Sequence, residues 1–209
     1  MGRERAIVSI IAAVLVAFGC AGGNGSSPTE PAAAGLIVNE CGAYPPASSS
    51  PYVLPFPVGV SARVFQGNCG PWTHMGFMQY ATDFALPVGE VVIAARGGEV
   101  VGIREHFRDD VDVNRGQSNY VLILHNDGTR AYYGHFRQDG VIVAVGELVA
   151  QGQQIGFAGN TGYTGSTPHL HIEVQGCRDG CDSIPITFRN AEPPDLGGLE
   201  MGDTYTAGS

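Results

Sequence analysis

The sequence predicts an all-β domain that is built mainly of antiparallel sheets and joined by long loops. Short β-prone runs, broken by Gly, Asn and Asp, follow one another from Tyr52 onward. No stretch keeps a helical period over three turns. The chain of 209 residues also contains 31 Gly and 13 Pro, which favour turns over helices.

Composition and charge limit the function. Hydrophobic residues make up 44 % and charged residues 15 %, which is typical of a globular protein. The formal net charge of -9 argues against nucleic acid as a partner, because phosphate binding requires a basic surface. Several acidic residues lie in 190–209, which we expect to be an acidic tail after the last strand.

The N-terminus, residues 1–20, is predicted to be a secretory signal. Two arginines precede an apolar run from Ala6 to Phe18, which is too short for an ordinary membrane span. A small residue followed by Cys20 resembles a bacterial lipoprotein processing site. That resemblance implies an exported protein of the cell envelope, in the periplasm or on the outer surface, that Cys20 anchors to a membrane. A plain signal peptide with an incidental Cys20 is the alternative.

After the predicted signal, the sequence becomes rich in small residues. Residues 21–35 are Gly, Ser, Pro and Ala with almost nothing to bury, which predicts a flexible linker. The folded domain is expected over 36–189.

Four cysteines lie in this domain, and an even number in an exported chain suggests two disulfides. Three pairings are possible. Cys41–Cys69 with Cys177–Cys181 is preferred, because the partners of each pair are near in sequence. A four-Cys zinc site is the alternative, which the spacing and the oxidising compartment disfavour.

The expected strands follow the β-prone runs in order. Asp127-Gly128 lies between two of them and predicts a tight hairpin turn. The expected strands are 60–65, 80–86, 90–95, 99–104, 119–125, 130–136, 154–158 and 169–175.

The segment 105–118 is polar and predicts a long loop on one side of the domain. It carries Asp109, Asp110 and Asp112. These carboxylates offer a calcium site, but a solvated loop is the favoured interpretation.

The segment PHLHIEV, 168–174, alternates between apolar and polar residues. In a strand its apolar residues share one face, and His169, His171 and Glu173 share the other. Two imidazoles that project together provide what a transition metal needs, and they also suit a ligand beside a proton-transfer group. Alone, an H-x-H pattern also arises by chance on an alternating surface strand.

Other residues add to this pattern. Asp83 lies in YATDFAL, where Ala81 and Ala85 share its face of the strand. Such a carboxylate is either poorly satisfied or a ligand with space around it. His74 lies just upstream, and His135 ends a strand in YGH.

Together, GNTGYTGSTPHLHIEV (159–174), YYGHF (132–136) and the stretch 74–101 resemble the lysostaphin/LytM-type zinc endopeptidases. The resemblance covers roughly residues 60–176. It implies that family's duplicated hybrid motif of the barrel-sandwich type. It also implies that 36–189 is a zinc metallopeptidase domain.

In that family the matching positions have known roles. The resemblance implies that His74, Asp83 and His171 bind one zinc ion and that His135 and His169 act in catalysis. The sequence departs from the family at one point. The usual first motif is H-x-x-x-D, whereas eight residues separate His74 from Asp83 here. His74 is therefore the least secure ligand.

Two His and one Asp as ligands leave the fourth coordination position of zinc open for a water molecule. Zinc lowers the pKa of such a water to about 7. One of His135 and His169 would take the water's proton, and the other would stabilise the oxyanion. The sequence does not decide which does which. Glu173 either orients a neighbouring His or forms a surface salt bridge. The two remaining histidines, His106 and His125, are expected to be surface or structural residues.

The resemblance also implies a substrate and residues that contact it. Asn119, Asn160 and Thr161 match polar substrate-binding positions, and the substrate would be peptidoglycan stem or cross-bridge peptides. The protein is expected to act as a monomer. Two alternatives stay open. One is a non-catalytic wall-binding domain that activates other hydrolases, and the other is a protease of host proteins or a carbohydrate-modifying zinc enzyme.

Overall fold

The structure, a computed structural model, describes residues 37–38, 41–111, 113–165 and 167–209. The predicted signal, linker and Cys20 lie outside these residues, and so does Asp112. Within the described part of the chain, no helix has the length and apolar character needed to cross a membrane.

The described chain is almost entirely β structure. Three short 3-10 helices are present among these residues: η1 (Ala47–Ser49), η2 (Gly76–Met78) and η3 (Arg115–Gln117). The strands are β1 (Ile37–Val38), β2 (Ala43–Tyr44), β3 (Ser61–Gln66), β4 (Thr82–Ala85), β5 (Val91–Ile93), β6 (Gly98–Arg104), β7 (Tyr120–Leu124), β8 (Arg130–Gly134), β9 (Phe136–Val141), β10 (Leu148–Val149), β11 (Gln154–Ala158), β12 (Leu170–Gln175), β13 (Ala191–Glu192) and β14 (Thr204–Ala207).

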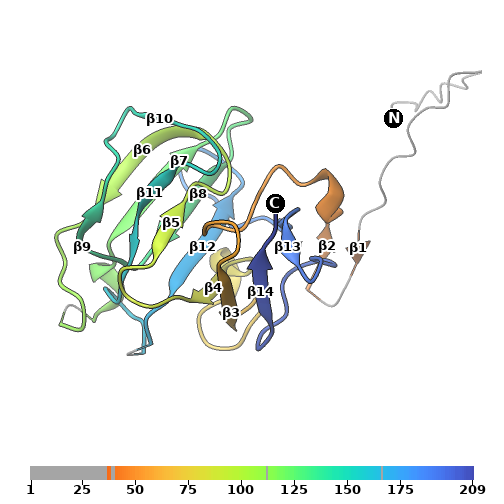
Figure 1. Cartoon of the computed structure of the whole chain (residues 1–209), viewed down its shortest axis with the longest axis horizontal. Coiled ribbons are helices and arrows are strands. Elements are labelled where there is room, and N and C mark those ends of the chain that lie inside the picture. The colour runs from red at the N-terminus through yellow and green to blue at the C-terminus, as the bar shows by residue number, and fades with distance from the viewer. Residues whose placement is uncertain (1–36, 39–40, 112, 166) are drawn as a thin grey trace, which may run out of the picture. The chain divides into compact units, whose positions relative to one another are not determined.

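Most strands belong to one nine-stranded sheet with the order β10-β6-β7-β8-β12-β4-β3-β14-β13 (Figure 1). A second sheet has the order β5-β11-β9, and β1 and β2 form a separate pair. Every strand pair in the three sheets is antiparallel. The predicted all-β, antiparallel fold class is therefore confirmed.

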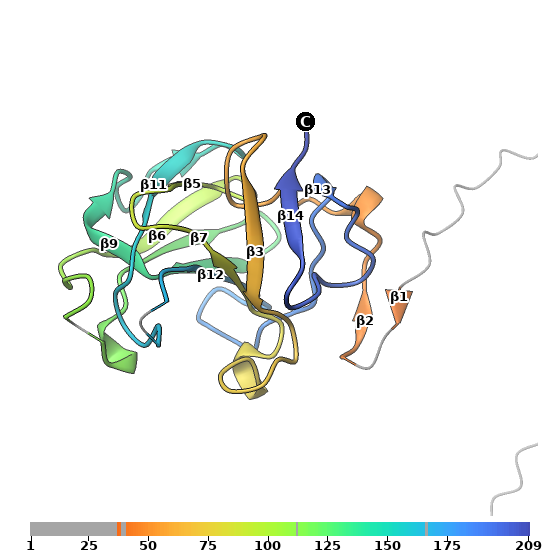
Figure 2. The same cartoon turned by 60° about the horizontal axis from the view of Figure 1, so that its bottom comes forward.

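The three-stranded sheet covers the β6-β7-β8 part of the large sheet, as Figures 1 and 2 show from two directions. The two sheets share one hydrophobic core. Val92 and Ile155 from the small sheet and Val121 and Ile123 from the large one are all 0 % exposed. Each such burial contributes about 1.5–3 kcal/mol, so the core holds the strands that carry the site in a fixed relation.

All eight expected strands are present, with ends within two residues of the prediction. One expected strand, 130–136, is interrupted. His135 has a φ of 68°, so β8 ends before it and β9 begins after it. The hairpin turn between β7 and β8 is confirmed, because the Gly128 N–H donates to the carbonyl of His125 and Gly128 has a φ of 85°.

The segment 190–209 is not a tail that follows the last strand. It contains β13 and β14, and β14 pairs with β3 inside the large sheet. Tyr205 and Ala207 are buried, so this segment has apolar surface to contribute. Asp195 is also buried and accepts hydrogen bonds from the N–H of Phe188 and from two glycines.

Both expected disulfides, Cys41–Cys69 and Cys177–Cys181, are formed. The preferred pairing is therefore confirmed, and the four-Cys zinc site is wrong. Cys41–Cys69 fastens the segment before η1 to the loop that leads to His74. Cys177–Cys181 closes the loop that follows β12.

Candidate metal centre

The centre of the site is made by pairing of neighbouring strands. The register between β4 and β12 places Asp83 directly opposite His171, and Oδ1 of Asp83 lies 2.8 Å from Nδ1 of His171. On its other side β12 pairs with β8, which places His171 opposite Gly134. A Cβ at Gly134 would lie 2.7 Å from the ring of Tyr132 in the same strand, so a glycine here leaves room for that ring beside the site.

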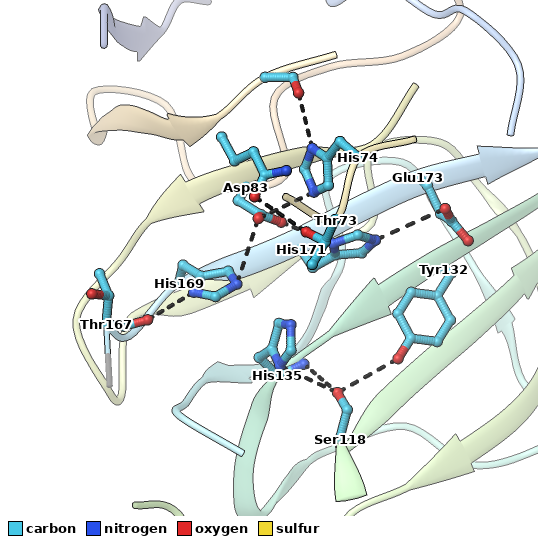
Figure 3. Close-up of polar contacts among 12 residues, drawn as sticks. Thr73, His74, Asp83, Ser118, Tyr132, His135, Thr167, His169, His171 and Glu173 are labelled. Carbon is cyan, nitrogen blue, oxygen red and sulfur yellow. Dashed lines mark hydrogen bonds and ion pairs between the residues drawn. The ribbon is translucent and has the colours of Figure 1, made fainter. Parts of the chain in front are cut away.

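His74 comes from the loop between β3 and β4 and is fully buried. Its Nδ1 lies 2.9 Å from the carbonyl oxygen of Gly67, and its Nε2 lies 3.1 Å from Oδ2 of Asp83 (Figure 3). The long spacer between His74 and Asp83 contains η2. The spacer therefore forms a local helical turn and still brings His74 to the carboxylate.

The residues fit a bound metal ion. Ligand atoms of His74, Asp83 and His171 all lie within 4.8 Å of one another. A carbonyl only accepts hydrogen bonds, so His74 donates its Nδ1–H to Gly67 and carries a lone pair on Nε2. This Nε2 is buried without a hydrogen-bond partner and faces a carboxylate oxygen. A cation between two electron-rich atoms removes their repulsion, and an N/O donor set suits zinc.

The electrostatics favour positive charge at the same place. Burial alone would raise the pKa of Asp83, but the adjacent histidines, His171 first, hold it well below its usual range. Burial lowers the pKa of His171, but the Asp83 carboxylate outweighs this effect and raises it to about 10. The carboxylate therefore favours a proton on His171 or a metal cation among the three ligand atoms.

Two further histidines lie beside this cluster. His169 has its Nδ1 2.7 Å from the carbonyl of Thr167 and its Nε2 3.7 Å from Oδ2 of Asp83. His135 has its Nδ1 2.6 Å from the carbonyl of Thr161. The two ring centroids are 4.5 Å apart. Each ring donates its Nδ1–H to a carbonyl, so each Nε2 is free to accept a proton.

Both rings are neutral at neutral pH. Burial is the main cause that lowers the pKa of His169. Burial, with the charges of His169 and His171, lowers the pKa of His135 to about 3. A neutral imidazole can act as a base, and it donates from Nε2 only after it has gained a proton.

Two residues at the site were not expected from the sequence. Ser118 accepts a hydrogen bond from the N–H of His135 at 3.1 Å, and the hydroxyl of Tyr132 donates to Ser118 at 3.5 Å. The backbone N–H that Ser118 accepts belongs to His135, the residue with the left-handed φ of 68°. Tyr132 stands in the YYGHF motif, so the sequence offered a way to predict its place at the site. Ser118 lies in no motif that would have indicated such a place.

Asn119, Asn160 and Thr161 are buried, and none of them lines the cavity that lies over the metal-binding cluster. The side chain of Asn119 donates to the carbonyls of Phe107 and Phe136, and the Thr161 hydroxyl accepts the N–H of Asn119. In this structure these residues support the loops, and their expected role as substrate contacts stays a prediction. Sequence could not separate the two roles, because both place polar residues beside a groove.

The two described aspartates of the 105–118 loop, Asp109 and Asp110, bind backbone and amide groups. Asp109 accepts hydrogen bonds from the N–H of Asn160 and of Gln138. Asp110 accepts one from the side chain of Asn160. The expected solvated loop is confirmed, because most of its described residues are exposed, and Asp109 and Asp110 in addition fasten this loop to the one before β12. Among the described residues, the potential metal-binding group is the one around Asp83.

Glu173 is 4 % exposed, so the surface salt bridge considered for it is wrong. Its Oε1 accepts a hydrogen bond from Gln175. Its Oε2 lies 3.9 Å from Nε2 of His171 and has no hydrogen-bond partner. His106 is exposed, and His125 is buried and donates to the carbonyl of Gly97. Neither of these two lines the cavity, as expected.

A cavity of about 650 Å³ lies over the metal-binding cluster. His135, His169 and His171 are among the residues that line it. Its lining also includes aromatic side chains from the loops around it, namely Trp72, Phe77 and Tyr163. The site is therefore open to a ligand of peptide size.

Comparison with known proteins gives consistent matches. Residues 77–183 match Peptidase family M23. The chain is 40 % identical over 94 residues to the peptidoglycan DD-endopeptidase ShyB of Vibrio cholerae, which covers 44 % of this chain and 19 % of that protein. It is 32 % identical over 120 residues to lysostaphin of Staphylococcus simulans, which covers 57 % of this chain and 20 % of that protein. The chain thus spans about a fifth of the length of these relatives.

Among solved structures, the catalytic domain of lysostaphin from Staphylococcus simulans aligns with a TM-score of 0.42 and 26 % identity. The alignment covers 59 % of this chain and 87 % of that one. The family match includes Asp83, His135, His169 and His171 but begins after His74.

Proposed function

Because the chain belongs to peptidase family M23, we propose that it is a zinc-dependent endopeptidase that hydrolyses peptide bonds in peptidoglycan stem or cross-bridge peptides. The convergence of His74, Asp83 and His171 within 4.8 Å carries this proposal. Two neutral histidines beside them and an open cavity support it. The printed names of two relatives, a peptidoglycan DD-endopeptidase and lysostaphin, support the substrate class.

Nε2 of His74, the carboxylate of Asp83 and Nδ1 of His171 would hold the metal. When bound, zinc supplies a Lewis acid and lowers the pKa of a bound water to about 7. Three protein ligands leave room for that water, which is the layout of a catalytic rather than a structural site.

His169 is the proposed general base. Its Nε2 lies 3.7 Å from Asp83, so it is close to where the attacking water would be held. The carbonyl of Thr167 fixes its tautomer, which keeps the Nε2 lone pair available. The ring would take the proton and deliver it to the departing amine.

His135 is the proposed second proton carrier. Its ring lies 4.5 Å from that of His169, and the carbonyl of Thr161 fixes its tautomer in the same way. Its ring N–H would stabilise the developing oxyanion. The proposal includes location in the cell envelope, with lipid attached at Cys20, and action as a monomer.

The test combines metal analysis with digestion of purified peptidoglycan by the full chain. We expect about one zinc per chain and new free amines without new sugar ends. His171→Ala should lose the metal, and His169→Ala should keep it but lose about 10²–10⁴-fold in turnover. His106→Ala, which removes an exposed histidine outside the cavity, is the matched control and should change neither. A metal-free protein that binds wall without cutting it would favour the non-catalytic alternative.

A further inference from the structure

One wall of the cavity is made by two side chains from separate loops. Arg115 comes from η3, and Tyr163 comes from the loop before β12. The guanidinium carbon of Arg115 lies 5.0 Å from the centroid of the Tyr163 ring. Both residues line the same cavity as His135 and His169.

This pair is held next to the catalytic histidines by the packing of its two loops. Gly162 has a φ of 80°, and a Cβ there would lie 2.9 Å from the Cα of Ser118. The loops therefore touch at a point where a larger residue does not fit. Ser118 in turn contacts the backbone of His135. Arg115 precedes Ser118 by three residues and Tyr163 follows Gly162, so both are tied to the His135 end of the site.

Hydrogen bonds within η3 and between the two loops further fix this wall of the cavity. Asn114 and Gln117 form a capping box around η3. Asp109 and Asp110 accept hydrogen bonds from Asn160 and so join the same two loops. These hydrogen bonds therefore hold in place the two loops that carry Arg115 and Tyr163.

Arg115 is the one arginine or lysine among the described residues that line the cavity. The acidic lining residues, Asp83 and Glu173, are 3 % and 4 % exposed and face the metal-binding cluster. No ion pair joins Arg115 to a carboxylate of the described residues. A guanidinium stacked on an aromatic ring keeps the N–H groups along its edge free, and these match the two oxygens of a carboxylate.

The rest of the cavity suits a peptide main chain with apolar groups. Trp72 and Phe77 are 65 % and 61 % exposed and line the cavity. Exposed aromatic residues of this size in a groove are typical of a binding surface. The cavity thus offers a cation beside the catalytic histidines together with aromatic contacts.

We propose that Arg115 is a specificity-determining residue that binds a carboxylate carried by the substrate peptide close to the scissile bond. The inference rests on the proposed function and deepens it. The substrate is an anionic peptide, and a neutral peptide of the same length is a poor one. Tyr163 orients the guanidinium and does not itself contact the carboxylate.

The test uses the full, metal-loaded chain and two substrates. One is the set of stem peptides released from purified peptidoglycan, and the other is the same set with carboxylates converted to carboxamides. The quantity measured is the ratio of kcat/KM on the native and the amidated peptides. Wild type should favour the native peptides about tenfold or more, as expected for a hydrogen-bonded charge pair. Arg115→Gln should bring the ratio close to one, and Arg115→Lys should give an intermediate ratio.

Arg189→Gln is the matched control, because it removes an exposed positive charge that does not line the cavity. It should keep the wild-type ratio. An equal ratio for wild type and Arg115→Gln would overturn the inference, and so would a wild type without preference. If wild type cleaves neither substrate, the proposed function fails instead. Calorimetric binding of the same peptides then decides on Arg115, since equal affinities would overturn its role and a preference lost in Arg115→Gln would support it.

Discussion

At the scale of single residues, the hydrogen-bond partners of the histidines determine their chemistry. His74, His135 and His169 each donate their Nδ1–H to a backbone carbonyl. This fixes which nitrogen is left for a metal or a proton. His171 differs, because its Nδ1 faces Asp83 and its Nε2 faces Glu173. The sequence placed His171 on the correct face of a strand, but it could not show which carbonyls and carboxylates the four histidines meet.

Glu173 provides a prediction at this scale. A metal-ligating histidine usually donates its other N–H to an acceptor, and Oε2 of Glu173 is the buried, unpartnered atom that faces Nε2 of His171. Glu173→Ala should therefore lower metal affinity by about 10–100-fold. Glu173→Gln, which keeps an acceptor oxygen, should lose less. Zinc titration in the presence of a competing chelator measures both, and equal affinity for wild type and Glu173→Ala would contradict this role.

His125 provides a prediction about pH. Burial holds its pKa below the ordinary value of 6.5, so the unfolded chain takes up the proton first as pH falls. The stability from the neutral ring is fully present above about pH 6.5 and decreases as pH falls below it. His125→Asn, which keeps a donor for the Gly97 carbonyl, should show a smaller loss of melting temperature between pH 7.5 and pH 5. An identical pH dependence in both proteins would count against this assignment.

At the scale of elements, alternation made the strands predictable. The segment that became β12 alternates so clearly that both its faces were identified. β9 was missed because FRQDGV is mostly polar and several of its side chains are exposed. β14 was missed because it is short and follows an acidic, Gly-rich stretch. Its pairing with β3 joins residues that are far apart in the sequence, and local patterns do not report such contacts.

The structural importance of β14 can be measured. Tyr205 is 4 % exposed, and its hydroxyl accepts the N–H of Glu200. Tyr205→Ala should lower the free energy of unfolding by about 3–5 kcal/mol, and Tyr205→Phe by about 1 kcal/mol. Thr204→Ala is the control on the exposed face of the same strand and should change it by less than about 0.5 kcal/mol. Urea denaturation measures all three, and a tolerated Tyr205→Ala would mean that this strand is dispensable.

The site was predictable to the extent that its residues lie in strong local motifs. The centre at Asp83 and His171 follows from their cross-strand register, which their motifs anticipated. The burial of Asn119, Asn160 and Thr161 was not predictable, because it depends on how the loops pack. Arg115 was missed for the same reason, since its partner Tyr163 lies in another loop.

At the scale of the whole molecule, metal binding should stabilise the fold. The three ligands come from β4, β12 and the loop before β4, so a bound ion joins separate parts of the sheet. At a free zinc concentration one hundred times Kd, binding to the folded state alone adds about 2.7 kcal/mol. Removal by a chelator should therefore lower the melting temperature by roughly 5–10 °C, and added zinc should restore it. An unchanged melting temperature after complete metal removal would contradict this coupling.

The position of β14 has a consequence for how the protein is made. β3 is the first strand of the large sheet in the chain, and one of its two neighbours is β14. A ribosome delivers β3 well before that neighbour exists. Until then one flank of β3 presents unpaired backbone groups, which invite association with other chains. We therefore expect a chain with this topology to associate less with other chains when that flank stays covered until the partner strand is available.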